Sequence, residues 1–469
     1  MAKHPTQVVA ECGVQCGLES TQDMGCEVNH GSGEMLLLLI ESQSGCFWST
    51  LNYNSSKTRL AMRNLAVAVR ALDPPEGGAE RSLAALVSGL LNPGPAYGES
   101  TVFLPFSPVE GMAETSDAWG VSVIQGAVNS NSEPILDKRV IKEVCGIETE
   151  SILSGLAWRL RSKTTGYPND SLRRIHLKRA NAKFAKAVGR WLDESPTKPE
   201  MGLTQLSWSS GAAEAFSIRG VPYVLFIRDE LPFRFPDVFS DAIEGAACVC
   251  AAGNGLGRQI QDSFKVSKME NVPLPIDYRS RFGDGEKVEA ALRSGRLARA
   301  DDGTSEVPRF AIIGIVPSTG LSTYKRLFPH LARNWPEATF DLYGSGLYIN
   351  ELAEHPNVTV RGFVPVEDIF SLCDVHVRIH ERFGTWGRVT NEAGIFRVPT
   401  VSNSVGSQPE AVGRGGVVVN DHHNVEEFEK ALRKCWEERA TLGEMAYEHS
   451  RVSDHRRSVS ILRSILDRL

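Results

Sequence analysis

Two strand–loop–helix units follow one another between Ser371 and Asn420, and this stretch limits the possible folds more than any other. The apolar run Val375–Ile379 predicts a buried strand, and Val389–Phe396 predicts the helix that follows it. Thr400–Ser402 predicts a second strand, and Pro409–Ala411 predicts a short second helix with proline at a favourable starting position. Adjacent units of this kind are typical of a parallel α/β sheet.

The glycine-rich loops of both units are predicted to face an anionic ligand. In a parallel sheet the two loops and the amino-terminal ends of the two helices open onto the same crevice, where exposed N–H groups favour phosphate. Glu392 lies near the start of the first helix. A carboxylate there would repel phosphate, but it can accept two hydrogen bonds from a diol such as ribose. The combination favours a nucleotide-sugar site.

This ordered series of motifs resembles the donor-binding half of the retaining glycosyltransferases of GT-B fold, the large group often called family 4. That family has Phe-Gly or Trp-Gly, then Glu-Ala at the start of a helix, then Gly-x-Pro-Val, and then a Gly-Gly-x-Pro-Glu turn. The counterparts here are Trp386-Gly387-Arg388-Val389, Glu392-Ala393-Gly394, Arg397-Val398-Pro399-Thr400 and Gly406-Ser407-Gln408-Pro409-Glu410, followed by Gly415-Gly416-Val417-Val418-Val419. Each motif alone is unspecific, whereas their order is specific. The alternative is an ordinary α/β sheet with glycine-containing loops.

The resemblance implies two Rossmann-like, doubly wound α/β domains with a cleft between them. Residues 62–277 are expected to form the acceptor-side domain, and 308–445 the donor-binding domain. The charged, glycine-containing segment 278–307 is expected to be a linker. Residues 446–469 are expected to hold a helix that crosses back to the first domain.

Composition excludes several other classes of protein. The chain has 469 residues, of which 42% are hydrophobic and 23% charged, as expected for a globular protein of two or three domains. A net charge of −6 gives no general reason to expect nucleic-acid binding. The longest apolar run, Met35–Ile40, is too short to span a membrane and lacks the pattern of a secretory signal. We therefore expect a cytoplasmic protein with free thiols.

Residues 1–61 differ from the rest of the sequence. They contain Cys12, Cys16, Cys26 and Cys46, many Gly, Ser and Asn residues, and no sustained hydrophobic period. We expect a poorly ordered N-terminal extension. A zinc site built from the four cysteines is the alternative, although no Cys-x2-Cys pair occurs.

The first domain begins with a second phosphate-approach motif. Leu65–Val69 predicts a buried strand, and Gly77 and Gly78 precede a predicted helix over Ala79–Leu91. In the resembled family this loop faces the donor diphosphate across the cleft. The strand predicted at Val221–Ile227 ends in Arg228, Asp229 and Glu230.

Two long helical patterns follow in the first domain, at Ile141–Lys163 and Ser171–Asp193. The second pattern carries many Lys and Arg residues beside an apolar stripe. A solvated basic face is the default interpretation. The alternative is that the basic face of 171–193 docks an anionic acceptor or an anionic membrane surface.

The sequence departs from the family at the cations that meet the donor diphosphate. The family usually has an Arg on the first strand of the second domain and a Lys a few residues later, and Ile315 and Thr319 stand at those positions. The nearest replacements are Lys325 or Arg326 on the next helix and Arg388 at the start of its own helix. Arg388 is the preferred candidate, and an ordinary surface arginine is the alternative.

Two further departures concern the transferred sugar. The family has two glutamates separated by seven residues, and counting back from Glu392 gives Gly384 instead of the first glutamate. Either an insertion returns Glu381 to the site, or the carboxylate is lost. Many relatives also have a His where this chain has Ser207–Ser210, and Arg228 could supply a polar group there or form an ion pair that closes the strand end.

The resemblance implies transfer of a sugar from a nucleoside-diphosphate sugar, UDP- or GDP-linked, with retention of anomeric configuration and without a metal or other cofactor. The acceptor is unidentified and could be a small molecule, a glycan or a lipid-linked molecule. The expected catalytic residues are Arg388, Glu381 and Arg228. The expected donor-binding residues are Gly77, Gly78, Gly344, Phe363, Val364, Glu392, Gly406 and Ser407. The alternatives are a nucleotide-sugar-binding protein without transfer activity and a GT-B sugar-nucleotide epimerase.

Overall fold

The computed structural model describes residues 63–469 apart from short gaps, and five strands within residues 1–62. The gaps are 74–77, 93, 96–113, 117, 128–133, 137, 148–151, 161–168, 302–305, 315–319, 345–346 and 382. Residues Met1–Met62 and Arg63–Leu469 form two separate compact units.

Within the first unit, β1 (Thr6–Val9) pairs with β2 (Gln15–Leu18) in antiparallel register. β3 (Cys26–Asn29), β4 (Leu36–Ser42) and β5 (Gly45–Leu51) form a second antiparallel sheet. The other residues of 1–62 lie outside the described part of the chain, so the expectation of a poorly ordered extension stays a prediction for them.

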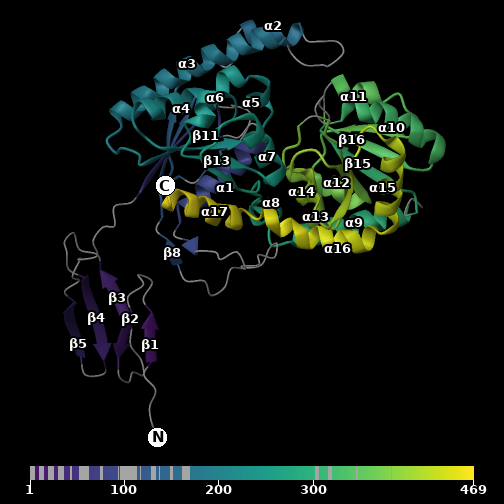
Figure 1. Cartoon of the computed structure of the whole chain (residues 1–469). Coiled ribbons are helices and arrows are strands. Elements are labelled where there is room, and N and C mark those ends of the chain that lie inside the picture. The colour runs from purple at the N-terminus through teal and green to yellow at the C-terminus, as the bar shows by residue number, and fades with distance from the viewer. Residues whose placement is uncertain are drawn as a thin grey trace. The chain divides into compact units, whose positions relative to one another are not determined.

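The first lobe of the second unit (Figure 1) contains β11 and β13. It is built on a seven-stranded parallel sheet with the order β10-β9-β6-β11-β12-β13-β14. The strands are β6 (Asn64–Val69), β9 (Gly120–Gln125), β10 (Ile141–Val144), β11 (Met201–Gln205), β12 (Tyr223–Ile227), β13 (Cys248–Ala251) and β14 (Met269–Asn271). Strand order reverses between β6 and β11, and in doubly wound sheets ligands bind outside the carboxyl ends of the strands at such a reversal. A two-stranded ribbon, β7 (Gly94–Pro95) with β8 (Glu114–Ser116), lies outside this sheet.

Helices cover both faces of the first sheet. They are α1 (Gly78–Leu90), α2 (Ile152–Arg159), α3 (Asp170–Glu194), α4 (Ser209–Ile218), α5 (Leu231–Arg234), α6 (Pro236–Glu244) and α7 (Asn254–Ser263), with a 3-10 turn at Leu206–Trp208. One core layer contains Phe184 of α3 and Phe216 of α4, and the other contains Leu86 of α1. The core therefore lies in two layers, one on each side of the strands.

The second lobe has a six-stranded parallel sheet with the order β17-β16-β15-β18-β19-β20. The strands are β15 (Arg309–Ile313), β16 (Thr339–Tyr343), β17 (Val358–Gly362), β18 (Val375–Arg378), β19 (Thr400–Asn403) and β20 (Gly416–Val419). Its helices are α10 (Leu321–Asn334), α11 (Leu347–Leu352), α12 (Val366–Leu372), α13 (Arg388–Ile395), α14 (Gln408–Val412), α15 (Val425–Glu437) and α16 (Arg439–Ser450). The predicted fold class of two doubly wound α/β domains is confirmed.

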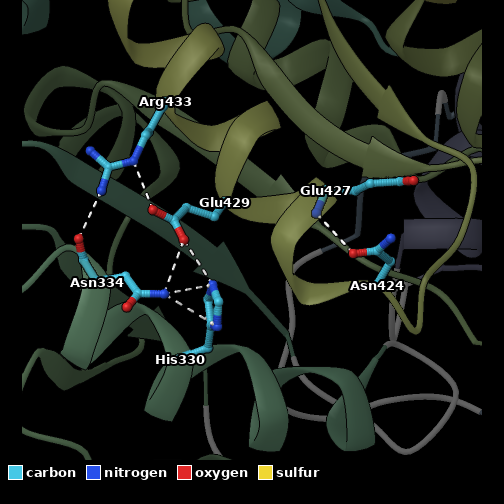
Figure 2. A network of polar contacts seen from close by, with 6 residues as sticks. All are labelled: His330, Asn334, Asn424, Glu427, Glu429 and Arg433. Atoms are coloured by element: carbon cyan, nitrogen blue, oxygen red, sulfur yellow. Dashed lines mark hydrogen bonds and ion pairs between the residues drawn. The ribbon is translucent and has the colours of Figure 1, made fainter.

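Polar contacts fix α15 against α10 in the second lobe (Figure 2). The carboxylate of Glu429 accepts hydrogen bonds from Arg433 at 2.9 Å and from Asn334 at 3.4 Å, and it lies 2.7 Å from Nε2 of His330. Arg433 also donates to the backbone carbonyl of Asn334 at 2.9 Å. Helix α15 begins where the side chain of Asn424 accepts a hydrogen bond from a backbone N–H of its first turn.

The segment 278–307, expected to be a linker, contains two helices, α8 (Tyr278–Phe282) and α9 (Glu286–Asp301). Helix α9 packs against α12 through Val288 and Leu292, which belong to the same core cluster as Phe370. The charged composition conceals this short apolar stripe. Residues 278–301 therefore form helices that belong to the second lobe.

The chain passes between the lobes twice, and the two crossings lie side by side. The backbone N–H of Ile276 donates to Ser453 at 2.7 Å, and the N–H of His455 donates to Ile276 at 3.1 Å. Helix α17 (His455–Asp467) then packs on α1 in the first lobe, with Leu462 and Ile465 in its core.

The prediction of one helix over Ile141–Lys163 was wrong at its start. Residues Ile141–Val144 form β10, which pairs in parallel with β9 at the edge of the sheet. The run is short, and its two aliphatic residues, Ile141 and Val144, are three positions apart, a spacing that favours a helix, although the segment pairs as an exposed edge strand. No helix within the described ranges is long and apolar enough to cross a membrane.

Candidate functional site

Glu392 lies at the centre of a charged cluster where the second lobe meets the first. The side chain is buried on α13, and its Oε1 lies 3.0 Å from Nη1 of Arg281 and 3.5 Å from Nη2 of Arg388. Arg281 comes from α8, and Arg388 is four residues before Glu392 on the same helix. The carboxylate therefore holds two guanidinium groups beside the start of α13.

Arg388 reaches from the second lobe to the first. Its Nη1 donates a hydrogen bond to the backbone carbonyl of Gly78, at the start of α1, at 3.3 Å. Burial lowers the pKa of Arg388, and the charge of Glu392 opposes that shift. The structure thus brings together Gly78, Arg388 and Glu392, three of the residues selected from the sequence. Gly77 lies outside the described residues.

Arg228 approaches the same helix start from the first lobe. It follows β12, stacks over the ring of Phe226 at 4.5 Å, and donates to the carbonyl of Ala79 at 3.0 Å. Burial lowers the pKa of Arg228 to about 9, so the guanidinium remains charged at neutral pH. Arg228 and Arg388 therefore bind successive carbonyls in the first turn of α1.

Arg378, at the end of β18, is a member of the cluster that the sequence analysis missed. Burial lowers its pKa, and the charge of Glu392 counteracts this. A Cβ on Gly387 would lie 2.6 Å from Nε of Arg378, and Gly387 has a φ of +69°, so glycine is needed for this approach. A charged residue at the carboxyl end of a buried strand was the available signal, because carboxyl ends of parallel strands meet at the ligand edge.

Each of these three arginines has a buried nitrogen without a hydrogen-bond partner in the described part of the chain. The atoms are Nη2 of Arg228, Nε of Arg378 and Nε of Arg388. Buried guanidinium N–H groups normally have partners. With Arg281, the four cations face two nearby carboxylates, Glu80 and Glu392, so the cluster has an excess of positive charge.

Glu381 contacts the start of α10. Its Oε1 accepts hydrogen bonds from Ser322 Oγ at 2.6 Å and from the backbone N–H of Thr323 at 2.9 Å. The carboxylate therefore caps the amino end of α10, where the helix dipole favours it. Lys325 pairs with Glu351 at 2.6 Å.

The other replacement cation that the sequence suggested is also engaged elsewhere. Arg326 donates to the carbonyl of His423 at 2.9 Å. Ile315 and Thr319 lie outside the described residues. Of the replacements considered for the missing Arg and Lys, only Arg388 contacts the Glu392 cluster within the part of the chain that is described.

The turn that contains Gly406 and Ser407 joins the two lobes. Ser407 Oγ accepts a hydrogen bond from the N–H of Leu256 at 3.2 Å. Glu410 accepts from the N–H groups of Asn254 at 2.7 Å and Gly255 at 2.6 Å. These groups belong to the first turn of α7 in the first lobe. Glu410, which the sequence analysis did not select, therefore caps a helix of the opposite lobe.

Three remaining candidates lie after β16 and β17. Gly344 has a φ of +116° and donates its N–H to the carbonyl of Gly362 at 2.7 Å. The Phe363 side chain is 85% exposed, whereas Val364 packs against the core near α12. An exposed aromatic ring at the carboxyl edge of the sheet is available for stacking on a planar ligand.

A separate cavity of about 420 Å³ lies in the first lobe at the carboxyl ends of β6, β11 and β12. Its lining includes Ser207 and Trp208, from the position where relatives have a His. His176 reaches the same cavity from α3, so an imidazole enters from a different element. Burial, with the charge of Arg173, lowers the pKa of His176.

The cavity also has charged walls. Arg70, Glu80, Arg173 and Asp229 line it. Burial raises the pKa of Asp229 to about 6, while a hydrogen bond from the N–H of Leu231 opposes the rise. The cavity can therefore bind a polar molecule with several hydroxyl or charged groups. The described residues include no group of three or more His, Cys, Asp or Glu side chains that could hold a metal ion.

Solved structures share this architecture. Sucrose-phosphate synthase from Thermosynechococcus elongatus has 14% sequence identity and a TM-score of 0.59, and covers 87% of this chain and 98% of its own. HepE from Anabaena in complex with UDP and glucose has 16% identity and a TM-score of 0.57, with 87% and 100% covered. The UDP-forming α,α-trehalose-phosphate synthase from Burkholderia xenovorans has 14% identity and a TM-score of 0.58, with 87% and 98% covered.

Two doubly wound parallel sheets, with a charged cluster between them, place the chain in the GT-B class of proteins. Residues 308–438 match the family described as Glycosyl transferases group 1. The match spans the second lobe from β15 to α15. A comparison with curated protein sequences gives no significant match.

Proposed function

We propose that the protein transfers a sugar from a nucleoside-diphosphate sugar, bound between the lobes, to an acceptor in the cavity of the first lobe. The observation that carries the proposal is the set of three arginines, Arg228, Arg378 and Arg388, each of which has a buried nitrogen without a hydrogen-bond partner among the described residues. They come from both lobes and surround Glu392 and the start of α1. A diphosphate supplies the acceptor oxygens that these groups lack.

The arginines would also promote the reaction itself. As the bond from the anomeric carbon to the phosphate oxygen breaks, negative charge develops on the departing nucleoside diphosphate. Guanidinium groups already held in place stabilise that charge without rearrangement. Arg228 and Arg388 are fixed by the carbonyls of Ala79 and Gly78, and Arg388 also by Glu392.

Glu392 is proposed to bind the ribose of the donor. Its two present partners differ in exposure, since the Arg281 side chain is 30% exposed and that of Arg388 is 11% exposed. A ribose diol would displace Arg281 and leave Arg388 in place for the diphosphate. Phe363, exposed at the same edge of the second sheet, is proposed to stack on the base.

The acceptor is proposed to bind in the 420 Å³ cavity. Asp229 and His176 line it and can orient an acceptor hydroxyl by hydrogen bonds. We propose retention of configuration, because the second lobe belongs to a family of retaining enzymes by the resemblance of its motifs. In such a reaction the leaving phosphate and the acceptor hydroxyl share one face of the sugar, so the protein mainly positions the reactants.

The test compares donor binding by the wild type and Glu392→Gln, using UDP-glucose, UDP, GDP-mannose and GDP in calorimetry. UDP-glucose is the first choice because HepE was crystallised with it. Loss of the carboxylate should weaken nucleotide binding by about 1–3 kcal/mol, which is roughly a five- to 150-fold rise in Kd. The matched control is Glu381→Gln, which should lower thermal stability and leave nucleotide affinity unchanged.

Equal affinity of Glu392→Gln and wild type for every nucleotide that binds would refute the ribose assignment. Absence of binding by the wild type to all four nucleotides would refute the donor site. Tight donor binding without hydrolysis or transfer, across a panel of sugar, glycan and lipid acceptors, would favour the alternative of a nucleotide-sugar-binding protein. Release of an altered sugar nucleotide without acceptor would favour an epimerase.

A further inference from the structure

Helix α2 presents a row of aliphatic side chains to solvent. Ile152, Leu156 and Leu160 are 84%, 38% and 59% exposed and are spaced four residues apart. Leu160 directly follows the helix and continues its last turn, since its N–H donates to the carbonyl of Leu156 at 2.9 Å. Residues at this spacing lie along one side of a helix. The three side chains form an apolar stripe with no core to cover it in the described structure.

The opposite side of α2 forms part of the first-lobe cavity. Ser154 and Ala157 line that cavity, and Ala157 is buried. At 100° per residue, they lie about 200° and 140° around the helix from Ile152. The backbone N–H of Asn169, which precedes α3, donates to the carbonyl of Ala157 at 2.9 Å and fixes α2 against the start of α3. One helix therefore separates the cavity from the outer surface.

Helix α3 continues this outer surface with positive charge. Arg179, Lys183, Lys186 and Arg190 are exposed and lie within about 60° of one another around the helix axis. They point away from the side that carries the buried residue Phe184. No ion pair involves any of the four cations in the described residues, whereas Arg174 and Lys178 on another side of α3 both pair with Asp237.

We propose that the outer faces of α2 and α3 dock on an anionic membrane surface and that the acceptor is a membrane amphiphile whose polar head enters the cavity. The second part rests on the proposed function. The two helices form one rim of the first lobe, so both can meet the same surface (Figure 1). Exposed aliphatic side chains on α2, together with cations on α3 that form no ion pair among the described residues, are complementary to an interface of acyl chains and anionic head groups.

The docked arrangement has a consequence for the reaction. Because α2 contacts the lipid on one side and lines the cavity on the other, the cavity lies within about 10 Å, one helix diameter, of the membrane surface. A head group could reach the cavity while its acyl chains stay in the bilayer. The phosphates of a nucleic acid could pair with the cations, but the three aliphatic side chains would add no binding energy to such a complex.

Binding is measured by co-sedimentation of the full chain with vesicles of phosphatidylcholine, alone or mixed equally with phosphatidylglycerol. The wild type should bind the anionic vesicles and show little binding to the neutral ones, with binding reduced at high salt. The aliphatic variant is Ile152→Ser/Leu156→Ser/Leu160→Ser, and its control is Ile218→Ser, a 71% exposed side chain on α4. The aliphatic variant should lose at least about tenfold in partition coefficient, and the control should match the wild type.

Charge is tested with Lys183→Glu/Lys186→Glu and its control Lys430→Glu/Lys434→Glu, which makes the same charge change on α15. Only the α3 variant should lose most of its binding to anionic vesicles. Failure of the wild type to bind anionic vesicles, or equal losses in the α3 and α15 variants, would overturn the proposal. Equal binding by the aliphatic variant and wild type would also overturn it.

The donor experiments remain independent of this result. Normal nucleotide binding without vesicle binding would refute membrane docking and leave the proposed donor site intact. Vesicle binding without nucleotide binding would support membrane docking and refute the proposed donor site. Transfer of radiolabelled sugar from UDP-glucose into the butanol phase, in the presence of vesicles of mixed neutral and anionic lipids, would support the lipid acceptor. Transfer only to water-soluble acceptors would overturn that part.

Discussion

Replacing Asp229 with asparagine should stabilise the protein at neutral pH and impair its activity. Burial raises the pKa of this carboxyl from an ordinary 3.8 to about 6. A pKa difference of one unit corresponds to about 1.4 kcal/mol, so the upper limit for the effect is about 3 kcal/mol. Because Asp229 lines a cavity that can admit water, we expect a gain between about 1 and 3 kcal/mol.

The direction in which stability changes with pH follows from proton binding to Asp229. Between pH 3.8 and about 6 the folded protein holds a proton on Asp229 that the unfolded chain has released, so the contribution of this group to stability falls as pH rises. Above about pH 6 the folded state carries the full cost of a buried carboxylate. The amide side chain of the Asp229→Asn variant would keep an oxygen to accept from the N–H of Leu231 without that cost.

The assay is thermal and urea unfolding of wild type and Asp229→Asn at pH 4, 5, 6 and 7.5. The stability difference should be near zero at pH 4, grow through pH 5, and be constant above pH 6. Asp237→Asn is the control, because the lysine beside Asp237 lowers the pKa of that carboxyl, and its loss should not stabilise. A variant that is no more stable than wild type at pH 7.5, or a difference independent of pH, would refute the reasoning.

Three other substitutions test the contacts and the packing of particular residues. Glu410→Gln removes the carboxylate that accepts hydrogen bonds from two N–H groups of α7. It should therefore lower stability by about 1–2 kcal/mol and increase the radius of gyration in X-ray scattering. An unchanged radius would argue against an interlobe role. Gly211→Ala should destabilise by about 1–3 kcal/mol in urea unfolding, because its Cβ would lie 2.2 Å from the carbonyl of Asn181. Gly155→Ala, with open space around it in α2, should instead stabilise by up to about 1 kcal/mol, and equal effects of the two alanines would contradict the packing argument.

The second lobe could be predicted from sequence to within a few residues. Strands β18 and β19 are short runs of mostly buried residues with glycines in the loops that follow, so both were located within one residue of their observed ends. The helix predicted over Val389–Phe396 is α13, Arg388–Ile395. Local patterns were sufficient here because every unit repeats the same strand–loop–helix order.

The first lobe and the linker were harder to predict because the decisive contacts are distant in sequence. Ile141–Val144 joins the sheet only by pairing with β9 at an edge. Residues 278–301 are largely polar along the chain, and only the surface of α12 shows why Val288 and Leu292 are buried. Local pattern carries no information about such partners.

The candidate site was predictable in part for the same reason. The contacts among Gly78, Arg388 and Glu392 follow from motif positions, and they were expected at one cleft. Sequence spacing could not show that Glu381 caps α10, since the carboxylate and its partners Ser322 and Thr323 lie on different elements. Sequence spacing also could not predict that Arg228 and Arg388 lie close together, because their proximity depends on how the two lobes meet.

The return of α17 to the first lobe affects the order in which the lobes can fold during translation. Leu462 and Ile465 of α17 complete one core layer of a sheet whose strands emerge from the ribosome much earlier. Nascent domains usually fold as they emerge, amino-terminal part first. Here the early sheet would expose an uncovered apolar layer until the second sheet had been synthesised. Nascent chains halted before His455 should therefore bind chaperones strongly, and those extended past Asp467 should be released.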